Sequence, residues 1–178
     1  MGMNLDTGFK SPSASASVDT GVGAAWTNTS NIYTSNNVYA TCDVGVQVSQ
    51  RLAAKTFGIS IPGNALIKGI VATIEGKVSG SDHVLTVRIY KNPYTVSPAA
   101  ADVSNAKTTT ITSTETTFTF GSSTDTWGET FTAADVNSTD FGVGLEIDTG
   151  LATYSIDHVQ LKIYYETRGG SRVQFIGI

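Results

Sequence analysis

Hydrophobic residues alternate with polar or small residues along most of this sequence. The alternation is clearest in Phe141–Ile147, where every second residue is large and apolar and the residues between are glycine or glutamate. A period of two puts successive side chains on opposite faces of a β-strand. The same pattern recurs in short runs at residues 44–48, 57–61, 70–75, 85–89, 117–120, 141–148 and 159–165. The chain must therefore fold into strands that bury one face.

The breaks between these runs carry turn chemistry. They include PGNA from Pro62, SGSD from Ser79, KNP from Lys91 and DTG from Asp148. Short strands separated in this way predict an all-β fold, an antiparallel, jelly-roll-like β-sandwich of about eight strands. No run alternates strands with long helices, so a parallel α/β sheet is not expected.

One short helix is predicted at residues 132–137. Thr132 can cap its first turn, and Asp135 stands where the acid of a capping box belongs. A weaker helical signal, from Ser97 to Ala106, predicts a loop with at most one helical turn.

The two ends of the chain differ in composition from the middle. Residues 1–24 are rich in serine, alanine and glycine and predict a flexible N-terminal arm. Residues 25–166 form the predicted sandwich domain, and residues 167–178 a C-terminal tail or an extra strand beyond a Gly-Gly pair. Apolar residues in the arm and the tail predict a contact with a neighbouring subunit or a last strand of the same domain. The candidate interface residues are Phe9, Lys10, Val173, Phe175, Ile176 and Ile178.

Charge excludes some classes of partner. Only 15% of the residues are charged, the net charge is -4 and the pI is about 5.0. A nucleic-acid-binding domain normally shows a basic face, so no nucleic-acid partner is expected. No apolar run approaches the roughly 20 residues of a membrane helix, and the first residues lack the apolar core of a signal peptide. No membrane partner is expected either. The single cysteine, Cys42, is predicted to be a buried thiol.

The sequence carries no nucleophile, P-loop or zinc-protease motif. Two Asp-His pairs, Asp82–His83 and Asp157–His158, could converge on a metal only if their strands were neighbours. Adjacent strand residues point to opposite faces, so one pair alone cannot hold an ion. A glycosidase would need two converging acids, and the candidates are Glu75, Glu146, Asp148 and Asp157. We expect these acids to be solvated, and we predict no catalytic residue, no metal and no cofactor.

Aromatic residues near the predicted strand ends leave two interpretations open. Exposed rings on a sandwich can stack on sugars, whereas rings at strand ends more often close the core or bury an interface. The residues concerned are Tyr33, Tyr39, Tyr90, Tyr94, Tyr154, Tyr164 and Trp26.

Three segments together resemble a β-sandwich protein found among the virion proteins of tailed bacteriophages. They are AAWTNTSNIYTSNNVYATCDV from Ala24, FGISIPGNALIKGIVATIEGKV from Phe57, and TWGETFTAADVNSTDFGVGLEI from Thr126. The closing strand SIDHVQLKIYY also follows that pattern. The residues that mark the fold are Trp26, Trp127, Gly128, Phe131 and Phe141. In the third segment Trp127 is predicted to plug one end of the sandwich, and Gly128 to let the chain turn tightly beside it.

The resemblance implies a non-enzymatic structural protein of the virion. It favours a capsid decoration (cement) protein that binds and stabilises the outer capsid surface. Its partners would be the major capsid protein or other virion proteins, and it would form a homo-oligomer, with a trimer favoured. The alternative is a receptor- or carbohydrate-binding module of a head or tail fibre that recognises a host glycan. A third hypothesis is a hydrolase of cell-wall or capsule sugars, and no catalytic residue is implied for it.

Overall fold

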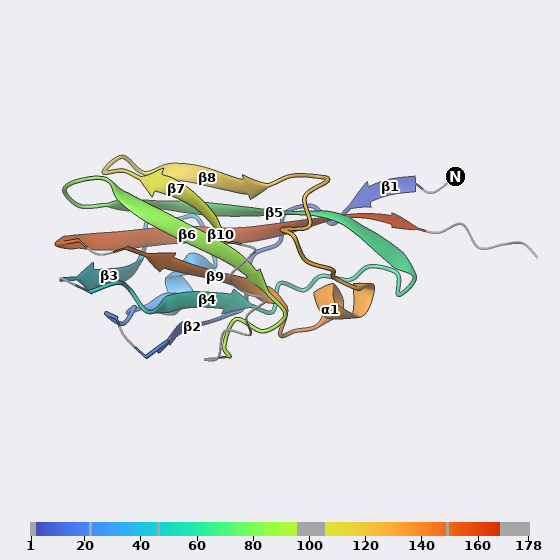
Figure 1. The fold of residues 1–178 in the computed structure, drawn as a ribbon, viewed down its shortest axis with the longest axis horizontal. Coiled ribbons are helices and arrows are strands. Elements are labelled where there is room, and N and C mark those ends of the chain that lie inside the picture. Colours follow the sequence, from blue (N-terminus) through green and yellow to red (C-terminus); the bar gives the residue numbers. More distant parts are fainter. Residues whose placement is uncertain (1–2, 22, 46, 96–105, 149, 168–178) are drawn as a thin grey trace, which may run out of the picture.

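Two antiparallel β-sheets stack face to face in the computed structural model of this chain (Figure 1), which describes residues 3–21, 23–45, 47–95, 106–148 and 150–167. Sheet A has the order β1-β10-β5-β8, with β3 also paired to β10, and sheet B has the order β2-β4-β9-β6-β7. The elements are β1 (Met3–Asp6), β2 (Ala14–Val18), η1 (Thr29–Ile32), β3 (Ala40–Val44), β4 (Arg51–Lys55), β5 (Ala65–Val78), β6 (His83–Tyr90), β7 (Lys107–Ile111), β8 (Thr116–Gly121), α1 (Ala133–Asn137), β9 (Gly142–Ile147) and β10 (Ala152–Thr167). The predicted all-β antiparallel sandwich is confirmed, with ten strands in the described part.

Successive strands cross from one sheet to the other. Among the described strands, only β6 and β7 follow each other within one sheet. Each crossing brings an apolar face toward the opposite sheet, so one core forms between the layers. Ile70 and Ile74 of β5 and Val143 and Leu145 of β9 are fully buried there. β5 and β10 run nearly the whole length of the sandwich (Figure 1).

The first strands differ from the arm that composition predicted for residues 1–24. β1 pairs with β10 from Met3↔Thr167 to Asp6↔Tyr164, and β2 pairs with β4 along all five of its residues. Serine and alanine supply little apolar area, but main-chain hydrogen bonds to an existing sheet edge do not require large side chains. Val18 is buried, and the Ser17 hydroxyl accepts a hydrogen bond from the Trp26 backbone N–H.

The alternation at residues 57–61 predicted a strand that the structure does not contain. Thr56 and Gly58 both have φ near +61°, which bends the backbone out of the strand conformation. The apolar side chains of this segment are still buried. The Asn137 side-chain amide completes the pairing of Ile61 by accepting from its N–H at 2.9 Å and donating to its C=O at 2.8 Å.

The region around α1 follows the prediction closely. The Thr132 hydroxyl accepts from the Asp135 N–H, and the Asp135 carboxylate accepts from the Thr132 N–H, which completes a capping box. Before it, Trp127 and Gly128 both have positive φ, and the Glu129 N–H closes a four-residue turn on the Thr126 C=O at 3.1 Å. This is the backbone pattern of a tight type I′ turn, with tryptophan at a position that usually excludes bulky residues.

Of the five residues that mark the fold in the sequence, four lie in the core. Trp26, Trp127, Phe131 and Phe141 are all buried, and Gly128 is an exposed turn residue. Phe131 and Phe141 meet edge to face, with ring centroids 5.5 Å apart.

The candidate interface residues fall into two groups. Phe9 is 43% exposed, and Lys10 pairs through its backbone with Leu161 of β10. Val173, Phe175, Ile176 and Ile178 lie outside the described residues, as does nearly all of the segment predicted to be a loop from Ser97 to Ala106. No helix in the described part is long and apolar enough to cross a membrane.

Candidate functional site

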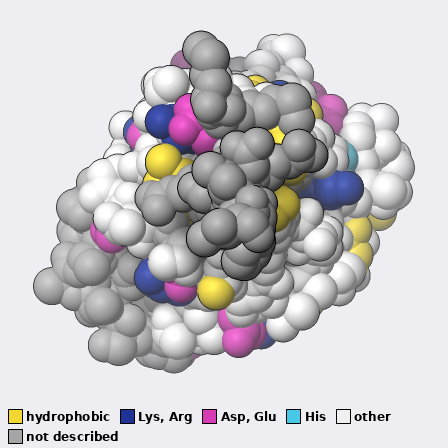
Figure 2. Space-filling model, turned by 90° about the vertical axis from the view of Figure 1, so that its right-hand side faces the viewer, with side chains coloured by type: hydrophobic (Ala, Val, Ile, Leu, Met, Phe, Trp, Pro, Cys, Tyr) yellow, Lys and Arg dark blue, Asp and Glu magenta, His cyan; other side chains and the backbone are white. Residues whose placement is uncertain are grey.

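A pocket of about 290 Å³ opens at the end of the sandwich where β1, the end of β10 and the start of β5 meet (Figure 1). One wall comes from β1, the floor from β10 and β5, and the facing wall from the loop that follows β8. Its lining residues are Asn4, Leu5, Asp6, Lys68, Ser123, Thr124, Tyr164 and Tyr165. Where described residues are visible on this end of the molecule, hydrophobic, basic and acidic side chains are interspersed (Figure 2).

A β-bulge forms the floor of the pocket. Tyr164 pairs with Gly69 and Tyr165 with Ile67, so Lys68 is an extra residue without a partner on β10. A bulge locally bends its strand and redirects the side chains beside it. The pocket is lined there by Lys68, by Tyr164 and by Tyr165, whose side chain also packs against the core.

Gly69 lets the facing wall come close. A Cβ atom added at Gly69 would lie 2.3 Å from the Ser122 carbonyl oxygen and 2.4 Å from the Ser123 carbonyl carbon. Both atoms belong to backbone, so only glycine allows the loop to cross β5 at this point. The loop and the partly exposed Tyr164 both line the same pocket.

The loop is fixed in position by its last residue, Asp125. The Asp125 C=O accepts from the Ile70 N–H at 2.9 Å, and its carboxylate accepts from the Trp127 N–H at 2.7 Å and from Lys107 Nζ at 2.7 Å. Partial burial acts to raise the pKa of Asp125, but the bonds from Lys107 and Trp127 outweigh it and lower that pKa. The carboxylate stays ionised, so the wall is held before any ligand arrives.

Several polar groups of the pocket have no partner within the described chain. The Asn4 amide, the Ser123 hydroxyl and the two tyrosine hydroxyls make no side-chain hydrogen bond to another described residue. Lys68 is 3.6 Å from Glu166, and the Asp6 carboxylate accepts from the Gly8 N–H at 2.8 Å. The pocket therefore offers aromatic surface together with free donors and acceptors, which is the chemistry of a site for a polar, non-planar ligand.

Most of the aromatic residues singled out in the sequence serve the fold. The Trp26 Nε1–H donates to the Gln50 C=O at 2.8 Å, and Tyr90 and Tyr154 are buried. The remaining rings outside the pocket are held by neighbours: the Tyr33 hydroxyl by Ser15, Tyr39 by Lys77 and Tyr94 by Lys55. Of the set, Tyr164 alone lines the described pocket.

The outer face of β10 continues from the pocket as a short aromatic row. Lys162 Nζ lies 4.9 Å from the centroid of the Tyr164 ring and 4.5 Å from that of Phe9. Phe9 belongs to the segment between β1 and β2, so β10 and the N-terminal segment build the row together. We name Tyr164, Lys162 and Phe9 the aromatic row.

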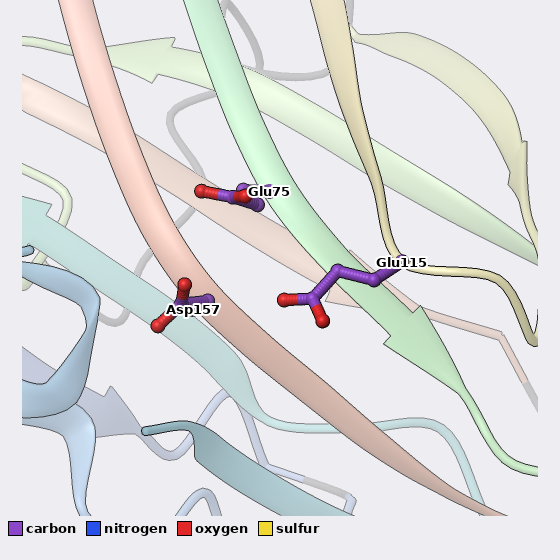
Figure 3. A group of neighbouring side chains, drawn as sticks. All are labelled: Glu75, Glu115 and Asp157. Carbon is purple, nitrogen blue, oxygen red and sulfur yellow. The ribbon is translucent and has the colours of Figure 1, made fainter. Parts of the chain in front are cut away.

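Three carboxylates converge at a second place, the middle of sheet A (Figure 3). Glu75 of β5, Glu115 before β8 and Asp157 of β10 each have an oxygen within 4.8 Å of the others. Oxygen donors of this kind suit calcium or magnesium. Glu75 and Asp157 are among the acids named from the sequence above, whereas Glu115 lies in a turn that carries no motif and is not.

Neighbouring groups already engage this acidic cluster. The Asp157 carboxylate is 1% exposed and accepts the backbone N–H groups of Asn36 and Asn37. Glu115 Oε2 accepts from the Tyr39 hydroxyl at 2.8 Å and faces Lys77 at 3.3 Å. Because Asp157 is inaccessible, the Glu75–Asp157 pair cannot flank a glycosidic bond, as the hydrolase hypothesis would require.

The two Asp-His pairs do not meet. His83 begins β6 in sheet B, and His158 lies on β10 in sheet A. His83 Nδ1 is 3.4 Å from Asp148 Oδ1, and its ring packs edge-on against Tyr154. His158 Nε2 is 2.8 Å from the Ser11 hydroxyl, and burial lowers its pKa against the opposing pull of Glu75 and Asp157.

Cys42 is a buried thiol, as its isolation in the sequence predicted. It is 1% exposed, and its Sγ donates to the Ala24 C=O at 3.3 Å. Burial, aided by the charge of Asp43, raises its pKa to about 11. A nucleophile needs the thiolate, which is scarce near neutral pH at that pKa.

No protein-family model matches the sequence, and no curated protein matches it. Distant likenesses exist among solved structures. "BiXyn10A CBM1 APO" aligns with 89% of this chain and 95% of its own at 12% identity and a TM-score of 0.45. "CBM4 structure and function" aligns with 86% of this chain and 97% of its own at 15% identity and a TM-score of 0.45. The glycoside hydrolase domain of Endo-D from Streptococcus pneumoniae R6 aligns with 91% of this chain but 21% of its own, at 12% identity and a TM-score of 0.36. Likenesses at these values assign neither family nor function.

Proposed function

We propose that this chain is a non-enzymatic carbohydrate-binding β-sandwich that holds a sugar in the pocket beside Tyr164. The observation that carries the proposal is the combination of a partly exposed tyrosine ring with amide and hydroxyl groups that have no partner among the described residues, all in one preformed pocket. A sugar presents both apolar C–H faces and hydroxyls, so it needs an aromatic platform and hydrogen-bonding groups around it.

The size of the pocket limits how much of a glycan enters it. Small-molecule sites occupy about 300–1,000 Å³, and this pocket, at about 290 Å³, is just below that range. One or two sugar units fit it, and the rest of a glycan would lie along the surface of sheet A. In the virion context that the resemblance implies, such a module would recognise a host glycan from a head or tail fibre.

Replacing Tyr164 by alanine tests this function. Tyr164→Ala removes the partly exposed ring but leaves the core intact, because Tyr164 is not one of the buried core residues. We expect at least about a tenfold loss of affinity for any glycan that the wild-type protein binds, as is common for a central aromatic contact. Screening on a glycan array followed by isothermal titration calorimetry measures it.

Tyr39→Ala is the matched control for that variant. Tyr39 is also a partly exposed tyrosine with a lysine over its ring, at 4.4 Å, but it lies beside the acidic cluster and outside the pocket. Its removal should leave glycan affinity unchanged. Equal losses in both variants, or no wild-type binding to any glycan on the array, would rule out the pocket as the site.

Capsid decoration is a second candidate, and the edge strand β8 favours it. Among the described strands, β8 pairs on one side only, with β5, and its residues TTFTFG contain no lysine or proline. Natural sheets use such residues to prevent pairing between exposed edges, so this edge is suited to pairing with another subunit or with the major capsid protein. A trimer on the outer capsid surface remains the predicted assembly.

Truncation of the C-terminal tail tests decoration. Removing residues 170–178 deletes nothing from the described strands, and the decoration hypothesis predicts that capsid occupancy is lost while the domain stays folded. Cosedimentation with empty capsids and circular dichroism measure the two properties. Full occupancy by the truncated chain would contradict a role for the tail. Deleting residues 1–20 is not an equivalent test, because it removes β1 and β2 from the sheets.

A further inference from the structure

Most of the basic residues that the structure describes are paired with carboxylates. Seven of those described have a carboxylate oxygen within 3.6 Å: Arg51, Lys55, Lys68, Lys77, Arg88, Lys91 and Lys107. Lys10 and Lys162 are the two described basic residues without such a partner. They lie side by side in the fold, because Lys10 pairs with Leu161, the residue before Lys162.

Lys162 forms no ion pair with a carboxylate among the described residues. Its ammonium lies over two rings, those of Phe9 and Tyr164, and its cross-strand neighbour on β5 is the apolar Val71. Rings attract a cation through their faces, but they leave its N–H donors available. One acid, Asp6, pairs with Tyr164 across β1 and β10, and its carboxylate accepts from the Gly8 N–H.

We infer that the ligand of this site is an acidic glycan, with a sugar ring on Tyr164 and a carboxylate, sulfate or phosphate group on the Lys162 ammonium. The inference rests on the proposed function and specifies the class of glycan. An ammonium between two aromatic rings is partly desolvated, so a charge-assisted hydrogen bond to an anion is stronger there than at an open surface. The exposed ring of Phe9 provides a platform for the next sugar unit.

A glycan array that contains neutral saccharides together with saccharides bearing carboxylate, sulfate or phosphate groups tests the class directly. We expect the wild-type hits to be acidic saccharides, and their affinity to fall as salt rises, because salt screens an ionic contact. Hits confined to neutral saccharides would overturn the inference but leave the proposed function intact. An array without hits would overturn both.

Variants of Lys162 then test whether this residue makes the ionic contact. For the strongest acidic hit, Lys162→Gln should weaken binding by about tenfold, the scale of one charge-assisted contact, and Lys162→Arg should restore most of it. Lys10→Gln is the matched control, since it removes an equally unpaired charge. The Lys10 side chain is exposed, and among the described residues only Lys162 has its ammonium over the rings of Phe9 and Tyr164.

The affinities of these variants distinguish the proposed carbohydrate site from the inference that its ligand is acidic. If Tyr164→Ala lowers the affinity for the glycan but Lys162→Gln does not, the pocket binds carbohydrate without recognising its charge. That result would overturn the inference. Equal losses in Lys162→Gln and Lys10→Gln would also overturn it, because they would reflect net charge and not a contact. Binding of poly-glutamate as tightly as the acidic saccharide would show that any polyanion suffices, which contradicts a glycan site.

Discussion

Replacing Trp127 by alanine should lower the free energy of unfolding by about 3–5 kcal/mol, the usual cost of deleting a buried tryptophan side chain. The ring is 2% exposed, and its Nε1–H donates to the Ile70 C=O at 2.9 Å. Alanine would leave a cavity between the sheets and a buried carbonyl without its donor. It would not relieve the positive φ at this position, which disfavours any residue with a Cβ atom.

Urea unfolding followed by circular dichroism measures this effect. Trp127→Phe is the control, because it keeps an aromatic ring in the cavity and loses the hydrogen bond, so it should cost clearly less than alanine. A cost below about 1 kcal/mol for Trp127→Ala would contradict a core role, since a buried tryptophan does not cost so little.

The second large effect concerns Arg51 on the outer face of sheet B. Its side chain is 5% exposed, its Nε lies 3.2 Å from Glu146 Oε1, and its guanidinium stacks 4.4 Å from the centroid of the Tyr90 ring. Nη1 also donates to the carbonyls of Pro93 and Thr95. Removing one partner of a buried ion pair leaves uncompensated polar groups, which costs about 3–5 kcal/mol. We expect Arg51→Ala to be at the lower end, because Glu146 keeps a second arginine.

Arg88→Ala is the matched control for that prediction. Arg88 Nη1 contacts the other oxygen of Glu146 at 3.0 Å, but its side chain is 20% exposed and no other bond to it is recorded among the described residues. Losing a partly exposed ion pair should cost about 1 kcal/mol or less. Chemical denaturation of both variants gives the comparison. Equal costs would mean that the carbonyl contacts of Arg51 add nothing to its ion pair.

Local signals in the sequence predicted local structure well. The capping box at Thr132 and Asp135 formed, and the alternation in Phe141–Ile147 became β9, because caps and strand faces depend on residues close in sequence. The strand predicted at residues 57–61 is absent, for a reason that the alternation does not contain. Its alternation is real, but the positive φ of Thr56 and Gly58 ends the strand conformation.

The pocket could not be predicted from local patterns, because residues far apart in the sequence form it. Tyr164 was recognised as one aromatic residue among several, without a reason to prefer it. Its partner Asp6 lies more than 150 residues away, in a segment whose composition predicted an arm. The bulge at Lys68 and the approach of the loop to Gly69 are properties of strand register, and one sequence does not determine register.

The position of a bound glycan tests the central claim most directly. We propose titrating the strongest array hit into ¹⁵N-labelled protein and following backbone amide shifts by NMR spectroscopy. A carbohydrate site at the pocket predicts the largest shifts at residues 4–6, 122–125 and 162–166, with little change at Glu75, Glu115 and Asp157. Shifts centred on the acidic cluster or on sheet B, with the pocket residues unmoved, would contradict it.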